Sequence, residues 1–178
     1  MGRLIALLRG VNLAARNRVS MPALRAALGA AGYEDVATLV ASGNIVLTSP
    51  KKPETVAREI REIVAGMGVE CAVVVRTRDE LAGVIERNPI PEGVEKPKML
   101  QVTFFSREPD PEVVEALVSQ DYGDERVVVQ GREAYAWHPN GVHKSKLARE
   151  LGKGLRADGT ARNWNTVTKL LELADGGP

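Results

Sequence analysis

The sequence has few of the residues that build disulfides and metal sites. Among its 178 residues it has one cysteine, Cys71, and two histidines, His138 and His143. A single cysteine excludes an internal disulfide and fits a reducing compartment. Neither histidine stands in a cysteine or carboxylate pattern with zinc-ligand spacing. We therefore expect no metal and no cofactor.

Long apolar runs are also missing. No segment approaches the roughly 20 apolar residues that span a bilayer. The N-terminal segment has neither the apolar core nor the cleavage context of a secretory signal. We expect a cytoplasmic protein with no membrane partner. With 44% hydrophobic and 26% charged residues, the chain has an ordinary globular composition, long enough for one domain or two small halves.

The formal net charge of +1 is distributed unevenly along the chain. Residues 1–50 carry five basic and two acidic side chains, and residues 138–178 carry seven basic and four acidic ones. Residues 77–137 carry seven basic and thirteen acidic side chains. A chain with basic terminal segments and an acidic middle segment can have a binding site for an anionic ligand. The alternative is that the charge distribution varies by chance on solvent-exposed faces.

The first strand and the polar loop after it organise the first half. Residues 4–8 form an apolar run, which predicts a strand buried on both faces and therefore central in its sheet. The loop that follows carries Arg9, Asn12 and Arg16. By analogy with open α/β sheets, whose ligands lie beyond strand ends, this loop is a candidate ligand site.

Helical and strand patterns alternate after this loop. Helices are predicted from Ser20, a plausible N-cap, and from Pro53, while residues 36–40, 45–47 and 71–75 read as strands. Ser42-Gly43-Asn44 predicts a tight turn in which Gly43 takes a positive φ. The order βαββαβ is that of the ferredoxin-like split βαβ unit, here residues 1–76.

Residues 77–178 are predicted to form a second ferredoxin-like half followed by C-terminal helices. A capping box opens at Thr77, a loop covers residues 89–97, and a hairpin joins residues 126–130 to 133–137. Helices are predicted over residues 143–151 and 163–174. The fold class is therefore α+β, with mainly antiparallel sheets.

The two tail motifs offer a second group of polar residues. Residues 140–146 resemble a turn that feeds a helix N-terminus, where Lys146 would favour an anion; the alternative is a capped helix with solvated lysines. Further on, Arg162 and Asn165 surround Trp164, which is expected in the core.

Several motifs in the same order resemble an uncharacterised bacterial family, domain of unknown function 1697. The residues that carry the resemblance are Leu7-Leu8-Arg9-Gly10-Val11-Asn12, Met21 and Leu24, Gly32 and Val36, Thr38, Ser42-Gly43-Asn44, Gly141 with Ser145-Lys146-Leu147, and Arg162-Asn163-Trp164-Asn165-Thr166. The resemblance implies two ferredoxin-like halves and brings no activity. Family members usually have Val-Gly-Gly where this chain has Leu13-Ala14-Ala15, which argues against a glycine-loop phosphate cradle here.

The leading hypothesis is a protein that binds a small anionic ligand, a nucleotide or phosphate ester, in a basic cleft. Its alternatives are a nucleic-acid binder that also uses Tyr135 and Trp137, and an enzyme acting on a phosphorylated substrate, for which no catalytic residue is nominated. We further expect Arg9 and Arg162 to share one cleft. The alternative is that each arginine forms a separate ion pair with a carboxylate. The predicted ligand-binding residues are Arg9, Asn12, Arg16, Ser42, Asn44, Lys146, Arg162 and Asn165.

Overall fold

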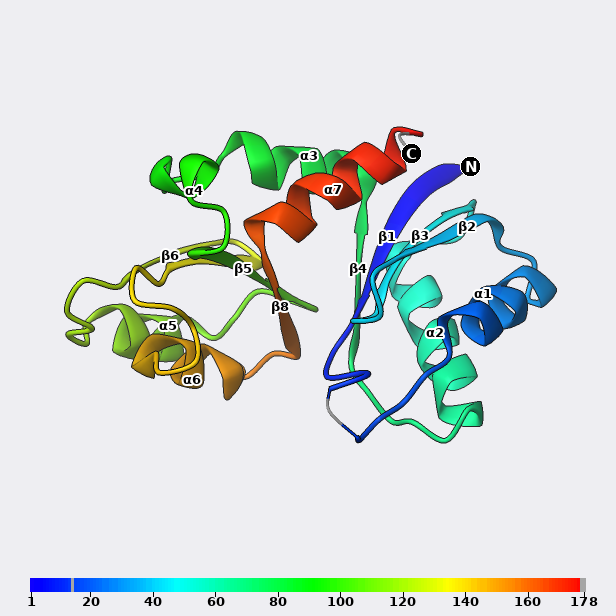
Figure 1. Cartoon of the computed structure of the whole chain (residues 1–178), viewed down its shortest axis with the longest axis horizontal. Coiled ribbons are helices and arrows are strands. Elements are labelled where there is room, and N and C mark those ends of the chain that lie inside the picture. The colour runs from blue at the N-terminus through cyan, green and yellow to red at the C-terminus, as the bar shows by residue number, and fades with distance from the viewer. Residues whose placement is uncertain (14, 177–178) are drawn as a thin grey trace. The chain divides into compact units, whose positions relative to one another are not determined.

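The computed structural model describes residues 1–13 and 15–176. The chain divides into two compact units (Figure 1). One contains Met1–Gly83 and the end of the chain from Lys169, and the other contains Val84–Thr168. The change of unit falls inside helices α3 (Arg78–Glu86) and α7 (Trp164–Ala174). The domain boundary expected between residues 76 and 77 stays a prediction.

The first unit contains the predicted βαββαβ arrangement. Its strands form one antiparallel sheet in the order β2-β3-β1-β4, which is the ferredoxin-like order. The elements are β1 (Gly2–Leu8), α1 (Met21–Ala30), β2 (Glu34–Leu39), β3 (Asn44–Ser49), α2 (Pro53–Gly66) and β4 (Val73–Thr77).

Strand β1 is central in this sheet, as its apolar run predicts. Ala6 pairs with Ile45 of β3 on one side and with Val75 of β4 on the other. All side chains from Leu4 to Leu8 are buried. Because β1 is paired along both edges and buried on both faces, its position in the sheet is fixed. The loop that follows therefore begins at a fixed point.

Helices α1 and α2 cover one face of this sheet (Figure 1). Ile60 and Val64 of α2 lie fully buried in the same core as Leu24 and Leu28 of α1. The Ser20 hydroxyl accepts a hydrogen bond from the Ala23 amide at 3.3 Å and so caps α1 as expected. The start of α1 is therefore fixed both by its cap and by its packed face.

The second unit repeats this topology, with strand order β6-β7-β5-β8. The hairpin strands have the predicted bounds. Strand β8 lies almost entirely between the two helices predicted for the tail, where no strand was expected. Its sequence, Gly-Thr-Ala-Arg-Asn, has no alternating large apolar residues and thus no strand pattern. The elements are β5 (Leu100–Phe105), α5 (Pro111–Val118), β6 (Arg126–Gln130), β7 (Glu133–Trp137), α6 (Lys146–Gly152) and β8 (Gly159–Asn163).

The connection between the two repeats begins with the predicted capping box. The Thr77 amide donates to Glu80 Oε2 at 2.7 Å, and the Glu80 amide donates to Thr77 Oγ1 at 3.1 Å. The segment expected as a plain loop contains a short helix, α4 (Glu92–Glu95). Trp164 is buried at the start of α7, as predicted.

The turn between β2 and β3 packs tightly on the end of β1. Gly43 has a φ of +81°, as expected, and its carbonyl oxygen accepts a hydrogen bond from the Leu8 amide at 2.8 Å. A Cβ atom at Gly43 would lie 2.6 Å from Val11 Cγ2 and 2.7 Å from Leu8 Cβ. Glycine is therefore required here both for its conformation and for space.

A matched pair of glycine variants separates these two requirements. Gly10 also has a positive φ, +67°, but a Cβ atom there would meet nothing within 4 Å. We expect Gly10→Ala to lower the free energy of unfolding by about 1 kcal/mol, the cost of the left-handed conformation. Gly43→Ala should cost at least about 1 kcal/mol more because of the added clash. Equal losses in urea unfolding would show that the turn does not pack on β1.

Candidate functional site

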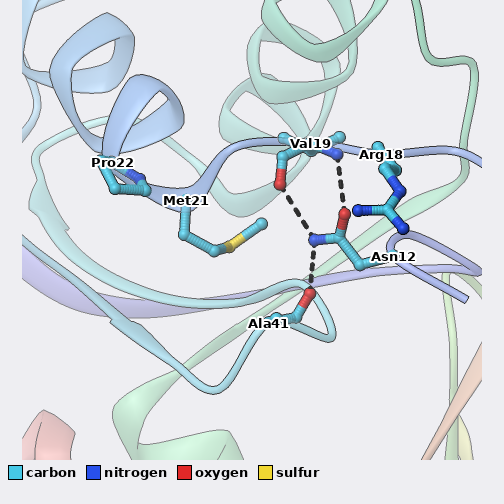
Figure 2. A pocket seen from close by; sticks show the side chains of 6 residues that line it. All are labelled: Asn12, Arg18, Val19, Met21, Pro22 and Ala41. Atoms are coloured by element: carbon cyan, nitrogen blue, oxygen red, sulfur yellow. Dashed lines mark hydrogen bonds between the residues drawn. The ribbon is translucent and has the colours of Figure 1, made fainter.

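A cavity of about 460 Å³ lies where the loop after β1 meets the start of α1 and the β2–β3 turn (Figure 2). Sequence reasoning placed Asn12 at a ligand site but did not select the other lining residues. Those residues precede or begin α1, or lie in the turn, so their meeting depends on how the loop folds back. The cavity is lined by Asn12, Arg18, Val19, Met21, Pro22 and Ala41.

The side chain of Asn12 holds two walls of the cavity together (Figure 2). Its Nδ2 donates to the Val19 carbonyl at 3.0 Å and to the Ala41 carbonyl at 2.6 Å. Its Oδ1 accepts a hydrogen bond from the Val19 amide at 2.8 Å. Both donor hydrogens of the amide are thus used on the backbone, so the observed role of Asn12 is to hold the loop against the turn.

The loop closes further on itself through Asn17. The Asn12 amide donates to the Asn17 carbonyl at 2.8 Å, and Asn17 Nδ2 donates to the Gly10 carbonyl at 3.3 Å. Asn12 and Asn17 have φ values of +54° and +51°, a region that asparagine tolerates better than most residues. Ala14 stands where family members usually have a glycine. It lies outside the described residues.

The loop that borders the cavity is rich in positive charge. Residues 1–33 contain no aspartate or glutamate, and the first turn of α1 carries no acidic residue. Arg16 and Arg18 are exposed, and within residues 1–13 and 15–176 neither forms an ion pair. By contrast, Arg126 pairs with Glu92 at 2.7 Å. Two arginines and a helix N-terminus therefore create a positive potential at this end of the sheet.

Two of the predicted residues belong to the turn itself. Asn44 is fully buried, and its Nδ2 donates to the Leu39 carbonyl and to Ser42 Oγ, each at 3.0 Å. Ser42 is exposed. These bonds shape the segment that carries Ala41, so the two motifs of the first half meet at the cavity. Arg9 is exposed at the end of β1.

The other three predicted residues belong to elements β8, α6 and α7. Arg162 is 9% exposed, and its Nη1 donates to Thr160 Oγ1 at 2.7 Å and to the Ala161 carbonyl at 2.8 Å. Burial lowers the pKa of Arg162 to about 10. Lys146 is exposed and Asn165 is half-buried. Arg9 and Arg162 belong to different units, and the cleft expected between them stays a prediction.

The start of α6 already has an anionic partner within the chain. Glu125 Oε2 accepts a hydrogen bond from the Leu147 amide at 3.4 Å, and Ser145 Oγ caps the helix by accepting from the Ala148 amide at 2.8 Å. These contacts match the capped-helix alternative, and anion binding by Lys146 stays a prediction. Glu125 escaped the sequence analysis, although the predicted hairpin places residue 125 beside residue 138.

Glu125, His138 and Ser145 share residue types with a catalytic triad, but their geometry differs. His138 Nδ1 lies 2.8 Å from Glu125 Oε1 and 3.1 Å from Ser145 Oγ, so both partners meet the same nitrogen. In a triad the nucleophile and the carboxylate meet opposite nitrogens. His138 is fully buried and Ser145 nearly so. This cluster therefore anchors the start of α6 and exposes no nucleophile.

The aromatic residues considered for base stacking are buried. Tyr135 is 1% exposed and Trp137 is 8% exposed, and the Tyr135 hydroxyl donates to the Val84 carbonyl at 2.7 Å. Burial, with a smaller contribution from the Glu133 charge, raises the pKa of Tyr135 to about 12. Neither ring offers a face to a base.

Metal and membrane signatures are absent from the described part of the chain. Its His, Cys, Asp and Glu side chains form no group of three that could hold a metal ion. No helix in it is both long and apolar enough to cross a membrane.

Comparison with known proteins gives a family and a fold. The family model described as a protein of unknown function, DUF1697, matches residues 1–135, so the chain belongs to this family. The tail motifs that also suggested the resemblance lie beyond the matched residues. A solved structure of a conserved bacterial protein from Streptococcus pneumoniae is similar with a TM-score of 0.82 and 21% identity, covering 98% of this chain and 99% of that chain. No curated protein matches.

The Glu125 cluster generates a pH-dependent prediction. Burial raises the pKa of Glu125, but hydrogen bonds from His138, Ser145 and the Leu147 amide lower it more, so the folded pKa lies below its usual range. The stability that this carboxylate contributes is present above the unfolded pKa and is lost as pH falls through the folded pKa.

Glu125→Gln should lower the free energy of unfolding at pH 7 by about 1–3 kcal/mol, because one carboxylate oxygen becomes a donor facing the Leu147 amide. The difference in the free energy of unfolding between the variant and the wild type should decrease as pH falls below about 4. Glu115→Gln, at an exposed position of α5, serves as the control and should change little. An equal difference in the free energy of unfolding at pH 7 and at pH values well below about 4, measured by urea unfolding, would contradict this account.

Proposed function

We propose that this member of an uncharacterised family binds a small organic anion, a phosphate ester or nucleotide, at the cavity beside α1. The observation that carries the proposal is Arg18, an exposed arginine without an ion pair in the described residues, lining a cavity of about 460 Å³ at the start of a helix. A guanidinium group binds phosphate through two parallel hydrogen bonds.

The backbone around the cavity favours the same charge. The cavity opens at the first residues of α1, Met21 and Pro22, where the helix dipole is positive. No acidic side chain in the first turn of α1 opposes this potential. An anion would thus gain from Arg18, from the helix and from Arg16 on the same loop.

The predicted site residues take two kinds of role in this proposal. Arg9 and Arg16 contribute positive charge together with Arg18. Asn12, Ser42 and Asn44 hold the loop and the turn that form the cavity walls. Contacts from Lys146, Arg162 and Asn165 of the second unit remain a further prediction.

Polynucleotide binding through the same arginines is the alternative. Burial of Tyr135 and Trp137 removes the stacking surface that this alternative assigned to the hairpin. The two possibilities also differ in salt dependence. Affinity for a polynucleotide falls steeply with salt because many phosphates release counterions, whereas a ligand with one or two charges responds weakly. An enzyme acting on a phosphorylated substrate would need a general base, and no described side chain at the cavity supplies one.

The test uses inorganic phosphate as the probe and amide chemical shifts as the readout. We expect saturable shifts at Asn12, Val19, Met21 and Ala41, and at least a fivefold weaker affinity for Arg18→Ala because the main cation is lost. Arg61→Ala, an exposed position on α2, removes the same charge elsewhere and should keep wild-type affinity. An equal loss of phosphate affinity in both variants would show that only the net charge of the protein matters. That result would overturn the proposed site.

A further inference from the structure

The cavity wall combines a cation with apolar side chains. Among the described residues that line it, Val19, Met21, Pro22 and Ala41 have apolar side chains. Its volume of about 460 Å³ falls among pockets that enclose organic ligands, about 300–1,000 Å³. A bare phosphate group would leave most of this apolar wall in contact with water.

Met21 forms part of that wall. Its side chain reaches from the start of α1 towards the side chain of Asn12 (Figure 2). It is half-buried and packs against the core of the first unit, so the stem is held while part of the side chain faces the cavity. A partly held thioether side chain adapts readily to an apolar partner.

The segments that wall the cavity also carry unusually exposed apolar residues. Leu13, next to Asn12, is 63% exposed, and Val40, next to Ala41, is 62% exposed. Val40 has a φ of +50°, a left-handed conformation that strains a β-branched residue. Asparagine or glycine would adopt this conformation with less strain than valine does.

We infer that the ligand is amphipathic: an anionic group meets Arg18, and an apolar group, such as an aromatic ring, packs against Met21 and its neighbours in the cavity wall. This inference rests on the proposed function and adds the chemical class of the ligand. It requires the two groups to lie side by side, because Arg18 and Met21 line the same cavity.

The test compares phenyl phosphate with inorganic phosphate, which share the anionic group and differ in the ring. The wild type should bind phenyl phosphate about tenfold more tightly, since the ring buries apolar surface. Met21→Gln should remove most of this difference in affinity between the two probes. Met67→Gln is the matched control, since Met67 packs against the same core but does not line the cavity, and it should preserve the difference.

A measurement on the wild type guards against loss of folding in the variants. Nuclear Overhauser effects should join the ring protons of phenyl phosphate to the methyl group of Met21. Equal binding of the two probes, both weakened by Arg18→Ala, would overturn the amphipathic ligand and leave the proposed function standing. Tighter phenyl phosphate binding without contact to Met21 would also overturn this inference. Binding of neither probe at millimolar concentration would overturn the proposed function and this inference together.

Discussion

The side-chain amide of Asn12 is the interaction on which the candidate site depends. Three hydrogen bonds from this one group join the end of the β1 loop, at Val19, to the β2–β3 turn, at Ala41. The two segments are separated by more than twenty residues in sequence. Without these bonds the segment at Val19 would lose its side-chain link to the turn at Ala41, and both residues line the cavity.

The two halves show that the fold alone does not make this site. Both units have the same strand order, but β1 connects to α1 through residues 9–20, whereas β5 connects to α5 through residues 106–110. The short second connection is held by Asp110, which caps α5 and pairs with Arg156 at 2.8 Å. In that unit the arginine beside the helix start is neutralised within the chain. In the first unit the longer loop presents Arg16 and Arg18 without acidic partners in the described residues.

Local signals made much of this fold predictable. The buried run of β1, the capping box at Thr77 and the hairpin across Gly131 each depend on neighbouring residues, and each is present. Strand β8 escaped prediction because it is defined by pairing with β5, and its small and polar residues carry no pattern of their own. The site was only partly predictable for a similar reason. The basic loop was evident from the sequence, but the positive φ values of Asn12 and Asn17 and the presence of Arg18 in the cavity wall were not.

Hydrogen exchange at one amide tests the role of Asn12 most directly. The Val19 amide donates to Asn12 Oδ1, so it should be protected in the wild type. Asn12→Gly removes the side chain while allowing the φ of +54°. The account predicts that exchange at Val19 becomes at least tenfold faster in this variant, while the amides of Ile5 and Val46 in the sheet keep their protection. An unchanged rate at Val19, or an equal increase at all three amides, would contradict it.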